Sequence, residues 1–264
     1  MKHIINLLFI CGLLIAIYPI IAKVYYNYDS TKQAEQLDNS RIDEQTKSRY
    51  KQQMAYNDAV RSRKQQLTSP EVMVRPKGKD VIMKKSEEII ATVKIPKLKL
   101  HYPVFDGATR ENLNKGVSRV TGMSYPVGGL STNSVLAAHS YSPFQEWFTH
   151  IDRLKNGDKV IVNNFKEKLT YQVYDRVIVT PDKVEAMDIK KGKDIITLLT
   201  CTPDGSKRLL IYAQRAHPKQ IIKQQAQPIQ QKSWYEQIKV LSDSWFVLSI
   251  VFIMTYLYVV SKKN

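Results

Sequence analysis

The sequence predicts a mainly β protein: a closed β-barrel of about eight strands with short helices, preceded by a charged helical segment and flanked by two transmembrane helices. Many short apolar runs separated by turn signals predict the barrel, because closing the sheet removes exposed strand edges. Two long apolar stretches bracket the chain and predict the membrane helices. The expected parts are a membrane anchor (1–27), a helical stalk and linker (28–88), the barrel (89–217), a juxtamembrane linker (218–244), and a second membrane helix with its tail (245–264).

The first apolar stretch, Ile4 to Ala22, would measure about 28 Å as a helix, close to the thickness of a bilayer core. Because no small-x-small cleavage site lies near Ala22, we expect an uncleaved anchor rather than a signal peptide. The second stretch, Trp245 to Val260, is shorter, but aromatic residues mark its ends and two lysines follow it. Lysines beside both spans favour cytoplasmic termini, so we expect a two-pass protein of the cell membrane with its barrel outside the cell.

Residues 28 to about 66 are polar and charged, with only a thin apolar stripe, and predict one or two solvated helices that form a stalk or pack lightly on the domain. Residues 68–88 lose this periodicity and predict a loop. The barrel strands follow as short apolar or alternating runs, and two segments between them predict helical turns, 110–114 and 143–148. The predicted strands are 89–95, 98–105, 134–138, 159–162, 169–179, 195–200 and 208–214.

The formal net charge of +16 would ordinarily suggest a nucleic-acid partner. Two membrane spans argue against that partner, and a basic domain beside an anionic membrane or envelope is the simpler interpretation. The two cysteines, Cys11 and Cys201, are too far apart in sequence for a metal motif, and no glycine-rich phosphate loop is present. We therefore expect no metal and no cofactor.

Cys201 ends an apolar strand and has no obvious disulfide partner, which predicts a chemical role for its thiol. Arg208 opens the next apolar run and could stabilise an anion beside that thiol. Arg215 is its rival, but the odd spacing along one strand turns the two arginines to opposite faces. Among the histidines His139 is the preferred base, since it ends a predicted strand and opens a loop. The other histidines are His3, His101, His150 and His217.

The segments around these residues resemble the sortases, the membrane-bound cysteine transpeptidases of Gram-positive bacteria. Thr197–Cys201 is similar to the TLxTC signature of that family. Three further segments resemble its pilin-polymerising branch, class C: Pro126–His139, Phe148–Asp158 and Cys201–Leu210. The resemblance covers roughly residues 86–217 and implies a sortase-like barrel. A second, C-terminal membrane span is also similar to class C.

The resemblance implies that Cys201 is the nucleophile that forms a thioacyl enzyme, His139 its acid/base partner, and Arg208 the stabiliser of the oxyanion. Thr200 would contribute to substrate binding. The implied substrate is an LPxTG-like sorting signal, cleaved between Thr and Gly. The acyl group would then pass to a lysine amine of another pilin subunit or to a cell-wall precursor.

Three alternatives accompany this interpretation. A housekeeping-type sortase that anchors surface proteins to a cell-wall precursor would share the same catalytic residues. An inactive membrane-tethered binding protein would have no use for an intact Cys201, His139 and Arg208. A papain-like peptidase is disfavoured because it would carry cysteine before histidine, at a helix N-terminus.

Two features depart from the class C pattern. The segment between Cys201 and Arg208 is short, with Asp204 where an aromatic residue is common. Neither Pro70 nor Pro76 belongs to the Asp-Pro-aromatic lid motif of that class. A lid formed by residues 68–88 would therefore need a different sequence.

Overall fold

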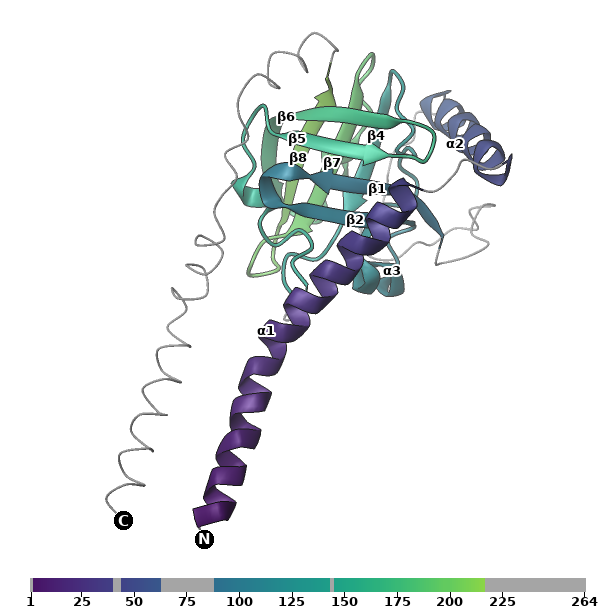
Figure 1. The fold of residues 1–264 in the computed structure, drawn as a ribbon. Coiled ribbons are helices and arrows are strands. Elements are labelled where there is room, and N and C mark those ends of the chain that lie inside the picture. The colour runs from purple at the N-terminus through teal and green to yellow at the C-terminus, as the bar shows by residue number, and fades with distance from the viewer. Residues whose placement is uncertain (1, 40–43, 63–87, 143–144, 217–264) are drawn as a thin grey trace. The chain divides into compact units, whose positions relative to one another are not determined.

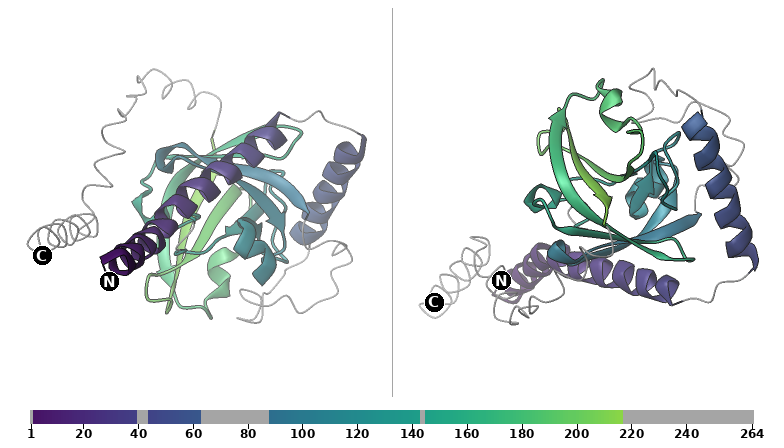
Figure 2. Two further views of the ribbon diagram at one scale, coloured as in Figure 1. Left: turned by 60° about the horizontal axis from the view of Figure 1, so that its bottom comes forward. Right: turned by 90° about the horizontal axis from the view of Figure 1, so that it is seen from above.

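A computed structural model describes residues 2–39, 44–62, 88–142 and 145–216. Its centre is a closed barrel of eight strands in the order β1-β2-β3-β4-β7-β8-β6-β5, which confirms the predicted closure (Figure 1). The strands curl around a common interior in the two further views of Figure 2. Their bounds are β1 Ile89–Ile95, β2 Leu100–Asp106, β3 Val117–Arg119, β4 Thr132–Ala137, β5 Lys159–Asn163, β6 Lys168–Val179, β7 Asp194–Cys201 and β8 Arg208–Arg215.

Two of the ladders are parallel, β2 with β3 and β4 with β7, and the others are antiparallel. Parallel pairing brings the C-terminal ends of β4 and β7 together, and β8 starts beside the end of β7. We call this part of the barrel the Cys201 end. The strand directions put the start of β1 and the end of β2 at the opposite end.

Side chains alternate along the strands, as the period of two requires. The larger apolar cluster fills the interior and includes Ile196 and Leu198 of β7 and Leu209 and Ile211 of β8. A second cluster lies on the outer face of the same strands and contains Leu199 and Leu210. This outer cluster includes residues of the 3₁₀ segment η4, Val184–Met187, which lies in the β6–β7 connection.

Three α-helices accompany the barrel: α1 Lys2–Asp38, α2 Glu44–Ser62 and α3 Arg110–Lys115. Two shorter 3₁₀ segments are η2 Pro96–Leu98 and η3 Ile151–Arg153. The predicted turn at 110–114 is α3, capped by the Thr109 hydroxyl, which accepts from the Asn112 N–H. The described part of the other predicted turn, from residue 145, forms turns before η3 rather than a helix.

Helix α1 continues without a break past the boundary predicted between residues 27 and 28. Its apolar part is long and apolar enough to cross a membrane, and within the described ranges it is the one helix with that property. The predicted second span, the linker before it and most of the predicted lid lie outside the described residues. Residues 1–216 and 217–264 form separate units.

Helix α2 is held to the barrel by a buried amide. The side chain of Asn57 donates to the carbonyl of Tyr125 at 3.0 Å and accepts from the Tyr125 N–H at 2.7 Å. The rings of Tyr56 and Tyr125 meet edge to face, with centroids 5.1 Å apart. Residues predicted to form a lightly packed stalk therefore include a specific docking contact.

Candidate functional site

Cys201 is the last residue of β7, and Arg208, the first residue of β8, lies directly opposite it in the antiparallel ladder. Residues directly opposite in such a ladder project their side chains to the same face of the sheet. Leu199, two positions before Cys201, and Leu210, two positions after Arg208, are paired and both belong to the outer apolar cluster. The thiol and the guanidinium therefore share the outer face at the Cys201 end, and both side chains are half-buried.

His139 lies just past the end of β4, the strand that runs parallel to β7. The ladder continues one residue beyond β4, because the N–H of Ala138 donates to the carbonyl of Leu199 at 3.1 Å. The carbonyl of His139 accepts from the N–H of Phe148 at 3.2 Å, which ties the following loop back to the strand end. The structure thus brings His139, Cys201 and Arg208 together at the ends of three neighbouring strands.

The imidazole of His139 is half-buried against the indole of Trp147, with ring centroids 5.2 Å apart. Burial lowers its pKa below the ordinary histidine value, because the charged form loses hydration. Among the described residues, no hydrogen bond joins this imidazole to another side chain. A neutral imidazole beside a thiol can accept the thiol proton, which is the chemistry a cysteine nucleophile needs.

The guanidinium of Arg208 donates to the carbonyls of Gly205 and Lys207, each at 3.1 Å. Asp204 instead accepts hydrogen bonds from the Thr202 and Ser206 hydroxyls. The bonds from Ser206 and Thr202 lower the pKa of Asp204 to about 2. The short turn between Cys201 and Arg208 is therefore ordered by its own polar groups, and Arg208 is held by backbone carbonyls.

Arg215 ends β8 at the opposite end of the barrel, where it pairs with Tyr171 of β6. Its guanidinium lies 5.5 Å from the centre of the Tyr171 ring, and the hydroxyl of that tyrosine donates to Asp194. Seven residues of extended strand, about 23 Å, separate the two arginines. Arg208 is therefore the arginine beside Cys201.

The other histidines lie apart from the thiol or outside what is described. His101 is buried under α1, with its Nε2 3.3 Å from Oδ2 of Asp38. Burial lowers its pKa, as it does for His150, which precedes η3. The side chain of His3 and all of His217 are among the residues that the structure leaves undescribed.

Thr200 is buried, and its hydroxyl donates to the carbonyl of Ala138 at 2.9 Å. This bond fastens β7 to the residue that precedes His139. It gives the side chain a structural task, and its role in substrate binding stays a prediction.

Trp147 is the residue of this site that sequence reasoning missed. It is buried, adopts a left-handed backbone (φ 30°), and leaves its indole Nε1 without a hydrogen-bond partner among the described residues. Its position directly before Phe148, where a segment compared with the family begins, was the available signal. A helical turn was expected at this position. A contact between Trp147 and His139, eight residues earlier, leaves no periodic pattern in the sequence.

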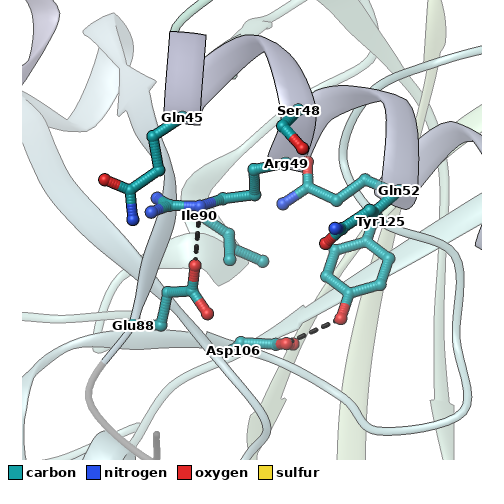
Figure 3. A pocket seen from close by; sticks show the side chains of 9 residues that line it. Gln45, Ser48, Arg49, Gln52, Glu88, Ile90, Asp106 and Tyr125 are labelled. Atoms are coloured by element: carbon teal, nitrogen blue, oxygen red, sulfur yellow. Dashed lines mark hydrogen bonds and ion pairs between the residues drawn. The ribbon is translucent and has the colours of Figure 1, made fainter. Parts of the chain in front are cut away.

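A separate pocket of about 230 Å³ lies between α2 and the opposite end of the barrel (Figure 3). Its charged groups are already paired: Arg49 contacts Glu88 at 2.7 Å, and Tyr125 donates to Asp106 at 2.7 Å. These pairs make the pocket a polar junction between helix and barrel. No group of three or more potential metal ligands occurs in the described part of the chain.

The chain matches the family model described as the sortase domain over residues 93–216. Sortase A of Bacillus anthracis is 35% identical over 127 residues, which are 47% of this chain and 59% of that protein. The chain spans only 52% to 62% of the curated relatives that it matches, which are named sortase A or sortase D.

This chain is also similar to solved sortase structures, and the similarity covers nearly the whole length of those structures. Sortase C of Streptococcus pneumoniae is 30% identical, with a TM-score of 0.62, and the similarity covers 72% of this chain and 97% of that one. Clostridium perfringens sortase C, solved with the C-terminal cell wall sorting motif, is 31% identical with a TM-score of 0.59, covering 72% and 98%.

Proposed function

Because the chain belongs to the sortase family, we propose that it is a membrane-anchored cysteine transpeptidase that cleaves an LPxTG-like sorting signal and joins pilin subunits. The observation that carries this proposal is the meeting of three strand ends, which supply a thiol, an imidazole and a guanidinium to one end of the barrel. The apolar part of α1 supports the anchor. The structure from Streptococcus pneumoniae, described in terms of pilin substrate specificity, supports the choice of substrate.

In the proposed reaction the Cys201 sulfur attacks the Thr carbonyl of the Thr–Gly bond, and His139 takes the thiol proton. Arg208 would swing from its backbone carbonyls to the oxyanion, where a permanently charged donor fork suits the developing charge. The C–N bond then breaks, and His139 returns the proton to the leaving glycine amine. A lysine amine of a second subunit attacks the thioester, forms the new amide bond and releases the thiol.

A second role is favoured by the curated relatives, since Sortase A of Bacillus anthracis is 35% identical to this chain. In that role a cell-wall precursor amine would resolve the same thioester, as in a housekeeping sortase. The two roles share the acyl-enzyme half of the reaction and differ only in the acceptor.

The test uses the full chain in detergent or vesicles with an LPxTG peptide. Intact-mass analysis should detect a thioacyl adduct on the unaltered chain and none on Cys201→Ala. Adding a pilin lysine peptide or a cell-wall-type amine should identify the acceptor by which one releases the adduct. If Cys201→Ala still joins subunits, the nucleophile is misassigned. If neither chain forms an adduct, the protein is a binding module.

A further inference from the structure

One face of α1 begins to contact the barrel at the point where the apolar stretch ends. From Ile4 to Ile21 most of the described large apolar side chains are exposed, whereas Ala22 is only 6% exposed. Beyond it the buried or half-buried positions recur with helical spacing, at Lys23, Asn27, Ser30, Ala34 and Asp38. Residues 22–38 are therefore a docked face of the helix, continuous with the proposed anchor, and not a free stalk.

The two ends of this docked face contact different parts of the barrel. At its C-terminal end, Asp38 accepts hydrogen bonds from Thr92 of β1 and Asn163 of β5. At the end nearer the apolar stretch, the ammonium of Lys23 lies 3.0 Å from the Glu146 carboxylate. The two contacts are separated by about 22 Å of helix. The orientation of the barrel along α1 is therefore defined.

Glu146 belongs to the loop that packs on the candidate histidine. Trp147 follows it directly, and the Trp147 indole packs on His139. The Tyr102 hydroxyl, which donates to Asn27 of α1, adds a second contact beside the Lys23 pair. The end of the docked face that adjoins the apolar stretch is thus the end that meets the Cys201 end of the barrel.

Lys23 is the first lysine or arginine after the apolar stretch, so in a membrane its ammonium belongs at the level of the lipid headgroups. The headgroup layer is about 5 to 7 Å thick on each side of the hydrocarbon core. A carboxylate 3.0 Å from that ammonium lies at or just above the same layer. The exposed Arg153 and Lys155 follow in the same connection between β4 and β5 and offer positive charge to anionic lipid.

We propose that the Cys201 end of the barrel faces the bilayer surface and that residues 145–158, in the connection between β4 and β5, contact lipid headgroups. The Cys201 thiol then opens close to the membrane plane. This inference rests on the proposed membrane anchoring, and it adds an orientation that the anchor alone would leave undefined.

The test measures energy transfer from a thiol-linked donor to an acceptor on lipid headgroups, with the full chain in vesicles. Cys11→Ser leaves Cys201 as the single labelling site at one end of the barrel. A triple variant, Cys11→Ser, Cys201→Ser and Lys168→Cys, carries the label at the start of β6 instead. The last residue of β6 pairs with Arg208, so the two labelling sites lie about 35 Å apart along the barrel. Transfer from position 201 should be at least twice that from position 168. Equal transfer from both positions, or greater transfer from position 168, would overturn the orientation.

Charge exchange tests the contact that sets the orientation. Lys23→Glu should reduce the difference between the two positions, and Lys23→Glu combined with Glu146→Lys should restore it. Exchanging the exposed pair Glu44 and Lys47 on α2 is the matched control and should change nothing. A chain that does not float with the vesicles also overturns the inference. Loss of the thioacyl adduct on the unlabelled chain, with transfer as expected, would instead refute the proposed function and leave the orientation standing.

Discussion

The two ends of the barrel use their polar side chains in different ways. At the end beside α2, Arg119 is 4% exposed, lies 2.7 Å from the Asp106 carboxylate, and donates to the Met123 carbonyl at 2.6 Å. Its guanidinium also covers the Tyr125 ring at 3.9 Å, and the Tyr125 hydroxyl donates to the same Asp106. Arg119 and Asp106 are thus each bonded to other parts of the fold, as buried polar groups require.

At the Cys201 end, the thiol, the imidazole and the guanidinium make few hydrogen bonds to other side chains among the described residues. The Cys201 thiol is free and half-buried, and the His139 imidazole packs against the ring of Trp147. Within the described part of the chain, Arg208 donates to backbone carbonyls of an exposed turn and to no side chain, so it can leave them at low cost. The comparison teaches that the Arg119–Asp106 pair uses its charges in bonds within the fold, whereas the candidate site holds groups that a substrate can still engage.

The largest expected effect comes from breaking the ion pair between Arg119 and Asp106. Arg119→Met leaves the half-buried Asp106 carboxylate without its cation, which should lower the free energy of unfolding by about 3 kcal/mol. Urea denaturation of the full chain in detergent measures this loss as a lower midpoint. Lys47→Met removes one partner of an exposed pair and is the control, with an expected change below about 0.5 kcal/mol. A loss of less than about 1 kcal/mol for Arg119→Met would show that this end is not a stability centre.

The second effect is on activity alone. Arg208→Lys keeps the charge but loses the planar donor fork, so kcat/KM for the LPxTG peptide should fall about 100-fold. Its unfolding midpoint should stay nearly unchanged, because the turn around Arg208 is exposed.

Arg215→Lys, at the other end of β8, is the matched control and should keep most of its activity. Full activity in Arg208→Lys together with a deep loss in Arg215→Lys would transfer the oxyanion role to Arg215. It would also contradict the argument from strand position.

Most of the barrel could be predicted because its strands alternate clearly and are separated by turn signals. The exception is β3, Val117–Arg119, which is too short for alternation to mark and pairs with strands on both sides only in the folded chain. The proximity of Cys201 and Arg208 could be predicted because a short turn joins their strands. His139 depends on the parallel β4–β7 pairing, which links distant segments that local patterns do not connect.

The docking of the helices was harder to predict, because polar side chains make part of their contacts. Hydropathy gives α1 an apolar part and α2 a thin apolar stripe, which indicated a solvated stalk. The docking of both helices includes specific polar contacts, made by Asn57 in α2 and by Lys23 and Asp38 in α1. A buried amide or an ion pair leaves no periodic signature in the sequence, so only the three-dimensional contacts identify it.

The smallest expected effect concerns Trp147 and the protonation of His139. Trp147→Phe should admit water beside the imidazole, so the pKa of His139 should rise toward the ordinary histidine value. The sign follows from burial, which disfavours the charged imidazole and therefore lowers the pKa in the unaltered chain. Because the neutral form accepts the thiol proton, the acidic limb of the activity profile should move to higher pH, while kcat/KM near pH 8 falls by less than about tenfold.

Titration of the imidazole Cε1–H signal by NMR measures this pKa directly, and His139→Gln identifies the signal by its loss. A merely structural role for Trp147 would lower the unfolding midpoint of Trp147→Phe and leave the titration where it was. An unchanged or lower pKa would therefore remove Trp147 from the catalytic end. A raised pKa would show that burial by this indole, in addition to the position of the strand end, sets the proton affinity of the imidazole beside Cys201.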